Sequence, residues 1–279
     1  MAPPSRAWGL GPAVVWWRNG RLGHRAVERC RRRSPGDLSG LTLRLEAHLG
    51  RRLAGAWLIG SGALGDFDRL RSDVDVQAVS TTRLARAELE RLAAALSHPA
   101  LRCPVRGLEF VLYAREDLSD PRGPAFQLNL NTGPGMEHHI GYDPDAEPRF
   151  WFMLDTAIAR QRARPLAGLS PTALLPPPSR PLVLSALRAA LDSYRRYDGA
   201  EAVLAACRAW AWATRGRWLS KGDAAAWAAA QLPDPAPVAR AFARRADPTT
   251  PGPTPSDVEA VLKPVKRMLA APAHRPASA

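Results

Sequence analysis

Hydrophobic and polar positions in the first half of the chain follow two different periods. An apolar run over Gly55–Ile59 predicts a short buried strand. From Asp73 onward, polar residues alternate with Val74, Val76 and Ala78, as in a strand with one buried face. Two further strands are predicted over Leu108–Tyr113 and Phe126–Asn131.

Helical spacing of apolar residues predicts three helices in the same half, over Asp37–Leu53, Leu84–Leu96 and Phe150–Arg162. The first helix is expected to bury a leucine stripe made of Leu41, Leu43, Leu45, Leu49 and Leu53. Strands that alternate with helices in this order indicate a domain with a mixed sheet and flanking helices.

The second half of the chain has a different pattern. Pro171 to Pro181 contains five prolines and few charges, which is typical of a semi-rigid linker. Beyond it, Ala, Leu and Trp at helical spacing predict a helical bundle. We expect helices over 181–195, 199–215, 221–231, 236–245 and 255–270, the last kinked or offset by Pro264. The predicted fold class is therefore α+β, with domains over 37–170 and 181–279 and a linker over 171–180.

Charge is distributed unevenly along the 279 residues. The formal net charge is +13, of which residues 1–36 contribute +7, from eight Arg and one Glu. We expect this basic segment to be a poorly ordered extension. Nearly all basic residues are Arg and they are not interleaved with aromatic residues, so we do not expect nucleic acid as a partner. No apolar run approaches the length of a membrane span, so we do not expect a membrane either. Cys30, Cys103 and Cys207 are dispersed along the chain, which fits a reducing cytoplasm. Separately, we expect the protein to be a monomer.

Candidate chemistry is concentrated near the first two predicted strands. Gly60-Ser61 follows the first strand, where backbone N–H groups and a small hydroxyl can approach an anion. Asp73 and Asp75 lie on one face of the second strand, and such a pair suits Mg²⁺, which keeps positions for substrate phosphates. Glu109 interrupts another apolar strand and is a candidate third carboxylate.

This order of strand, Gly-Ser and Asp-x-Asp resembles the signature of the DNA polymerase β-like nucleotidyltransferase superfamily. The resemblance implies that Gly60 and Ser61 hold the triphosphate of ATP, and that Asp73, Asp75 and Glu109 hold Mg²⁺. The adjacent His138 and His139 would point in different directions on a regular element. We therefore do not expect them to form a metal site together.

The predicted bundle carries a second resemblance, in Cys207–Trp210 and Leu219–Ala228, with Asp198 and Asp192-Ser193-Tyr194 before them. These stretches resemble the C-terminal domain of aminoglycoside adenylyltransferases of the streptomycin/spectinomycin type, and the match spans residues 40–270. The resemblance implies that Glu109 takes the proton from the attacking hydroxyl and that Arg208 and Lys221 face the nucleotide. It places Asp198, Asp192 and Tyr194 toward the antibiotic.

One departure from that family concerns the acceptor. Its streptomycin-modifying members carry a Trp and an acid just before the position of Asp198, whereas this chain has Arg195 and Arg196 and no Trp there. The sequence therefore favours spectinomycin over streptomycin. We expect a nucleotidyltransferase that uses Mg-ATP to adenylylate a hydroxyl of an aminocyclitol or aminoglycoside, conferring resistance. Two alternatives stay open: another acceptor, such as a small molecule, protein or tRNA end, or a non-catalytic nucleotide-binding relative.

Overall fold

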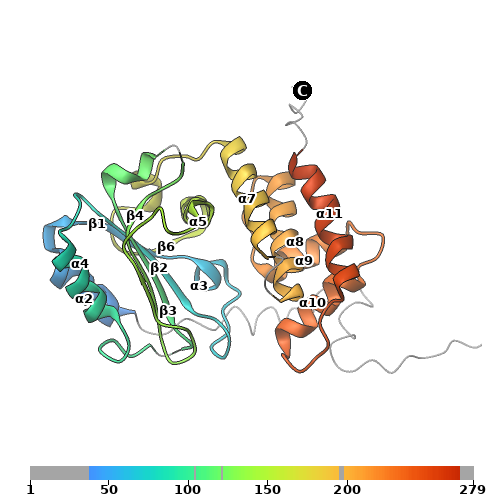
Figure 1. Ribbon diagram of the computed structural model, residues 1–279, viewed down its shortest axis with the longest axis horizontal. Helices are drawn as coiled ribbons and strands as arrows, with labels where there is room; N and C mark the ends of the chain where they lie inside the picture. Colours follow the sequence, from blue (N-terminus) through green and yellow to red (C-terminus); the bar gives the residue numbers. More distant parts are fainter. Residues whose placement is uncertain (1–37, 104, 121, 195–197, 271–279) are drawn as a thin grey trace, which may run out of the picture.

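The structure is a computed structural model that describes residues 38–270 except 104, 121 and 195–197. A sheet domain and a cluster of helices lie side by side, as Figure 1 shows. The expected basic extension over 1–36 and the charges of Arg195 and Arg196 lie outside the described residues. The α+β fold class is confirmed.

A six-stranded mixed sheet forms the first domain, with the strand order β5-β4-β3-β2-β1-β6. Only β2 and β3 run parallel, and every other neighbouring pair is antiparallel. Parallel neighbours need a crossover, which the helix α4 (Arg86–Leu96) provides between them. The strands are β1 (Leu53–Leu58), β2 (Val74–Ser80), β3 (Leu108–Ala114), β4 (Phe126–Thr132), β5 (His139–Gly141) and β6 (Arg164–Gly168).

Helices cover the two faces of this sheet (Figure 1). On one face, α2 (Ser39–Leu49) and α4 pack a core that includes Leu45, Leu92 and Phe110. On the other face lie α5 (Arg149–Arg162) and the short α6 (Pro171–Leu174), around Trp57 and Phe152. Alternate residues of each strand therefore enter different cores, as a period of two requires.

The leucine stripe expected on the first helix is correct only in part. Leu41, Leu45 and Leu49 are buried, but Leu43 is 64% exposed, because a step of two residues turns a helix by about 200° to the opposite side. The helix ends at Leu49, the 3₁₀ turn η1 (Gly50–Arg52) follows, and Leu53 begins β1 rather than ending the helix.

Several short elements were not predicted. α3 (Gly60–Leu64) begins at the expected Gly-Ser turn, and η2 (Arg115–Ser119) follows β3. β6 pairs with β1 and contains Pro165, which is tolerated because β6 is an edge strand. The predicted linker 171–180 contains α6, whose Pro171 and Leu174 are buried.

Five helices build the second domain in the predicted order. Their bounds are α7 (Arg180–Tyr194), α8 (Gly199–Arg215), α9 (Lys221–Ala229), α10 (Ala236–Ala246) and α11 (Pro255–Ala270). α8 lies at the centre, with Val203, Leu204 and Cys207 fully buried, and packs against each of the other four. Pro264 lies inside α11.

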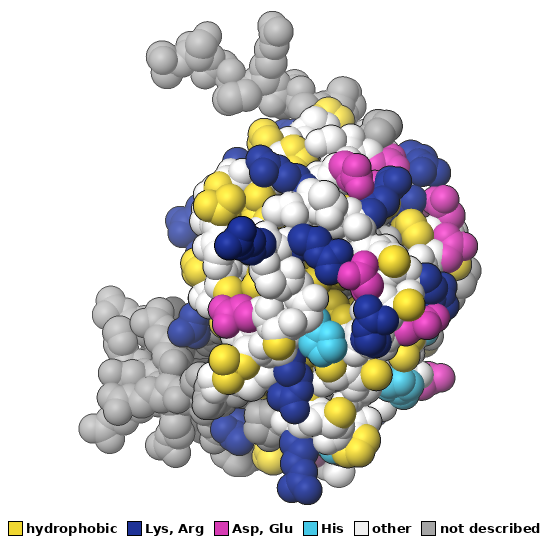
Figure 2. Space-filling view, turned by 90° about the vertical axis from the view of Figure 1, so that its left-hand side faces the viewer, with side chains coloured by type: hydrophobic (Ala, Val, Ile, Leu, Met, Phe, Trp, Pro, Cys, Tyr) yellow, Lys and Arg dark blue, Asp and Glu magenta, His cyan; other side chains and the backbone are white. Residues whose placement is uncertain are grey.

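On the face of the sheet domain that Figure 2 shows, basic and acidic side chains are interspersed rather than separated by sign. No helix in the described part of the chain combines the length and the apolar character needed to span a membrane.

Candidate active site

The end of β1 positions a glycine against a carboxylate. Gly60 has a φ of 59°, and a methyl group at its α-carbon would lie 1.8 Å from Asp75 Oδ2, so only glycine fits. The backbone N–H of Ile59 donates to the carbonyl of Asp75 at 2.9 Å, which fixes the two strands at this point. Ser61, on the first turn of α3, has a buried Oγ that lacks a hydrogen-bond partner among the described residues.

Strand register brings the second and third carboxylates together. Asp75 of β2 is the direct neighbour of Glu109 of β3, and each carboxyl group is close enough to act on the pKa of the other. Asp73 immediately precedes β2, and its charge acts on both groups. The candidate acids from two separate stretches of sequence therefore form one cluster.

The electrostatics of this cluster are unfavourable for negative charge. Burial raises the pKa of Glu109 to about 7, and the nearby carboxylates of Asp73 and Asp155 contribute to the rise. Burial, followed by the charge of Glu109, raises the pKa of Asp75 well above its ordinary value. Acids that repel one another in a buried site are stabilised by a proton or by a cation.

Asp155 is a member of the cluster that the sequence interpretation missed. It lies on the sheet-facing side of α5 and burial raises its pKa to about 6, although Arg208 acts to lower it. The signal was available, since Asp155 is the one charged residue between Phe150 and Ala159. Burying a carboxylate inside such an apolar helical run lowers the stability of the fold unless a positive charge or a hydrogen-bond donor pairs with it.

Basic side chains approach the cluster from the helical domain. The charge of Arg208, on α8, acts on Asp155, while its buried Nε has no hydrogen-bond partner among the described residues. Lys221, the first residue of α9, acts electrostatically on Glu109. Its Nζ lies 2.5 Å from Glu201 Oε2, so in this structure the lysine is held by a carboxylate of α8.

Glu201 also binds Arg245 of α10, with 3.2 Å between the guanidinium and its Oε1. Although burial acts in the opposite direction, Lys221 and Arg245 hold the pKa of Glu201 below its ordinary value. The sequence interpretation did not include this pair of contacts. Ser220 caps α9 by accepting a hydrogen bond from the Asp223 N–H at 3.0 Å, as expected for the start of this helix.

Direct contacts join the two domains beside this site. The backbone N–H of Gly222 donates to Asp66 Oδ2 at 3.2 Å, and Asp66 belongs to the loop between α3 and β2. In the same loop, the guanidinium of Arg71 donates to the carbonyl of Arg245. The loop that leads into Asp73 is therefore anchored to the N-terminus of α9 and to the end of α10.

The three positions expected to face the antibiotic have different surroundings. Tyr194 is near the cluster, since Arg208, Asp155 and Glu109 all act on its hydroxyl, and burial raises its pKa to about 12. Asp198 caps α8, accepting from the Ala200 N–H at 2.7 Å, and lies 3.4 Å from Arg244 Nε. Asp192 pairs with Lys266 of α11. Their roles toward a substrate remain predictions.

The carboxylates of the cluster are the candidate donors for a metal ion. Within the described residues, no three His, Cys, Asp or Glu side chains gather into a group that could hold a metal ion unaided. Mg²⁺ is usually held by one or two carboxylates together with water and substrate phosphates. The neighbouring Asp75 and Glu109, with Asp73 just before β2, fit this pattern, while the three-carboxylate site stays a prediction.

His138 and His139 have different surroundings. His139 begins β5, and its Nε2 is 3.1 Å from Glu147 Oε1. Glu147 also accepts from Asn129 Nδ2 at 2.7 Å, so this carboxylate joins β4 to β5. His138 is exposed.

Comparison with known proteins concerns the C-terminal half of the chain and the overall fold. Residues 173–269 match the family described as aminoglycoside adenylyltransferase, C-terminal domain. The fold is similar to the crystal structure of a spectinomycin adenyltransferase from Enterococcus faecialis with ATP and spectinomycin, at a TM-score of 0.60 and 15% identity. That similarity covers 84% of this chain and 98% of the other. No curated protein matches the sequence.

Proposed function

We propose that this chain is a nucleotidyltransferase that adenylylates a hydroxyl of an aminocyclitol such as spectinomycin, because residues 173–269 match the C-terminal domain of aminoglycoside adenylyltransferases. The observation that carries the proposal is the pairing of Asp75 with Glu109 beside the Gly60-Ser61 turn. The spectinomycin adenyltransferase of similar fold was crystallised with ATP and spectinomycin, which supports this acceptor class.

One group of residues is assigned to binding the nucleotide. For the phosphates of ATP, Ser61 offers a buried hydroxyl that has no hydrogen-bond partner among the described residues, and Lys221 offers a cation at a helix N-terminus. Arg208, whose Nε has no hydrogen-bond partner in the part of the chain that the structure describes, is the second cation directed at the nucleotide. The nucleotide must compete with Glu201 for Lys221, since the two are in contact before it binds.

Glu109 is assigned the proton transfer. Its carboxylate takes the proton of the acceptor hydroxyl, whose oxygen attacks the α-phosphorus of ATP, and pyrophosphate leaves. Asp73 and Asp75 would hold Mg²⁺, which supplies charge neutralisation at the phosphates when bound. Most of the remaining acceleration comes from aligning the hydroxyl with the phosphate, a task for the residues of both domains.

Two substitutions distinguish these roles. Glu109→Gln keeps the size and hydrogen-bonding reach of the side chain but cannot accept a proton, so kcat should fall by roughly 10²–10⁴ while ATP affinity stays nearly unchanged. Lys221→Ala is the matched variant, because it removes a phosphate contact that exists before the transition state and should weaken ATP binding. Pyrophosphate release with Mg-ATP and spectinomycin gives kcat, and calorimetry gives the ATP dissociation constant.

The same assays can overturn the proposal. Absence of pyrophosphate release from the unaltered protein across a panel of aminocyclitols and aminoglycosides would remove the acceptor class. An unaltered kcat in Glu109→Gln would remove the base, and an unaltered ATP affinity in Lys221→Ala would remove the nucleotide contact.

A further inference from the structure

A row of polar side chains crosses four strands of the sheet in direct register. Asp75 of β2 neighbours Glu109 of β3, Glu109 neighbours Asn131 of β4, and Asn131 neighbours His139 of β5. Residues in register across neighbouring strands point to the same face of a sheet. The row therefore leads from the reacting carboxylates to the exposed edge strand β5, seen beside β4 in the strand order.

Asn131 differs from the other side-chain amides of β2 and β4. Gln77, Gln127 and Asn129 are buried, and each is occupied by internal hydrogen bonds. The bonds run from Trp57 Nε1 to Gln77 Oε1 at 3.0 Å, from Leu84 N to Gln127 Oε1 at 2.7 Å, from Gln127 Nε2 to Ser80 Oγ at 2.9 Å and from Asn129 Nδ2 to Glu147 Oε2 at 2.7 Å.

Asn131 is partly exposed, and among the residues that the structure describes its amide has no hydrogen-bond partner. The three hydrogen-bonded amides stabilise the sheet, whereas the Asn131 amide has both its donor and its acceptor available within the described structure. Its position next to Glu109 makes the difference important, because directly opposed residues have Cβ atoms only about 5 Å apart.

We propose that Asn131 is a specificity-determining residue, which binds a hydroxyl or amine on the carbon next to the reacting hydroxyl of the acceptor. A group held at Glu109 has its neighbouring ring substituent within reach of the Asn131 amide. An amide can donate to an oxygen or accept from an N–H or O–H, so it selects acceptors by their hydrogen-bonding groups rather than by their charge. This inference rests on the proposed function and adds a feature of the acceptor to it.

The geometry also assigns the direction from which the acceptor enters. His139 ends the row with a side chain 47% exposed, and its Nε2 is engaged by Glu147. The other end of the row is closed, because Gly60 abuts Asp75. The acceptor therefore lies over β3 and β4 and extends toward β5, while the nucleotide occupies the side of Ser61 and Lys221.

Asn131→Ala tests the inference, with Asn129→Ala as the matched control two residues earlier on the same face. Loss of one hydrogen bond to the acceptor should raise the spectinomycin KM roughly 10-fold or more, with the ATP dissociation constant and the thermal midpoint unchanged. The control should show the reverse, a lower thermal midpoint from the lost bond to Glu147 and an unchanged spectinomycin KM.

A second readout uses binding without turnover. Calorimetry with spectinomycin and a non-hydrolysable ATP analogue should show the same loss of affinity in Asn131→Ala, and Asn131→Gln should recover part of it. An active parent enzyme with unchanged acceptor affinity in Asn131→Ala would overturn this inference alone. A parent enzyme that transfers AMP to no aminocyclitol would overturn the proposed function and this inference with it.

Discussion

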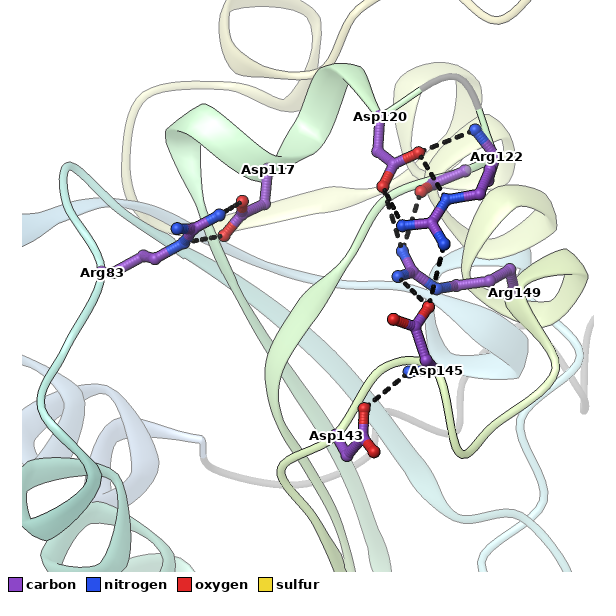
Figure 3. Close-up of polar contacts among 8 residues, drawn as sticks. Arg83, Asp117, Asp120, Arg122, Asp143, Asp145 and Arg149 are labelled. Atoms are coloured by element: carbon purple, nitrogen blue, oxygen red, sulfur yellow. Dashed lines mark hydrogen bonds and ion pairs between the residues drawn. The ribbon is translucent and has the colours of Figure 1, made fainter.

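Acidic side chains have opposite surroundings at the two ends of the central strands. Where β2 and β3 begin, Asp75 and Glu109 face each other, with Asp73 and Asp155 nearby. Beyond the end of β3, Asp117, Asp120 and Asp145 are each bound by arginine, as Figure 3 shows. Arginine therefore neutralises the acids at one end of the strands, whereas at the other end burial and mutual repulsion outweigh the charges of Arg208 and Lys221.

The contrast also appears in the pKa values. A hydrogen bond from Arg122 holds the pKa of Asp120 below its ordinary value, and one from Arg149 does the same for Asp145. Burial has the opposite effect on Asp75 and Glu109. Acids that serve the fold are stabilised as carboxylates, whereas the clustered acids are destabilised until another positive charge arrives.

The largest expected effect comes from removing one acid of the cluster. Asp75→Asn should lower the rate of AMP transfer by about 10³-fold, because several kcal/mol of transition-state stabilisation depend on a metal ligand. The metal-free protein should become more stable, since one of the repelling charges is gone. Turnover measured by pyrophosphate release at saturating Mg²⁺, with thermal unfolding in EDTA, checks both parts.

Asp145→Asn is the control for that experiment, because it removes an acid that binds Arg122 and Arg149. It should leave turnover unchanged and lower the thermal midpoint slightly. Near-parental turnover in Asp75→Asn would contradict the metal assignment, and greater stability in Asp145→Asn would contradict the comparison.

A second prediction concerns the pH dependence that Asp155 imposes. Its pKa in the folded protein is about 6, against an ordinary value of 3.8, so the folded state binds more protons between these pH values. The contribution of Asp155 to stability must therefore fall as pH rises from about 4 to 6, by an amount on the order of 2 kcal/mol.

Asp155→Asn should remove this contribution. Urea unfolding at pH 4.5 and 7.5 in EDTA should show a smaller decrease in unfolding free energy for the variant than for the parent protein. Identical decreases in the two proteins would show that Arg208 compensates the Asp155 carboxylate in the folded state.

The smallest effects are expected within the arginine network. The Arg149 side chain is 13% exposed and contacts Asp145 at 2.7 Å and the carbonyl of Gly123 at 3.2 Å. Arg149→Ala should lower the free energy of unfolding by about 1–2 kcal/mol, because it leaves partly buried acceptors unpaired.

Arg122 offers the comparison, since its side chain is 63% exposed although it binds Asp120 at 3.0 Å. Arg122→Ala should lower the free energy of unfolding by less than Arg149→Ala does, as is usual for exposed ion pairs. Urea unfolding measures both values, and equal losses would mean that burial is not what separates the two arginines.

Local patterns in the sequence determined most of the secondary structure. The helix expected over 199–215 is α8 with the same bounds, because apolar spacing continues between Asp198, whose side chain caps it, and Gly216. The Asp73–Ala78 alternation likewise predicted which side chains of β2 share a face, since a strand has a fixed period of two.

Only the tertiary structure decided which partners those residues have. Strand alternation gives the face of Glu109 but not its register with Asp75 and Asn131, because pairing joins segments distant in the sequence. In the same way, the contact of Lys221 with Glu201 and the approach of Asp155 to the cluster depend on how α5, α8 and α9 pack. Local periodicity selects elements and faces, whereas the charges that a side chain meets are set by packing between elements.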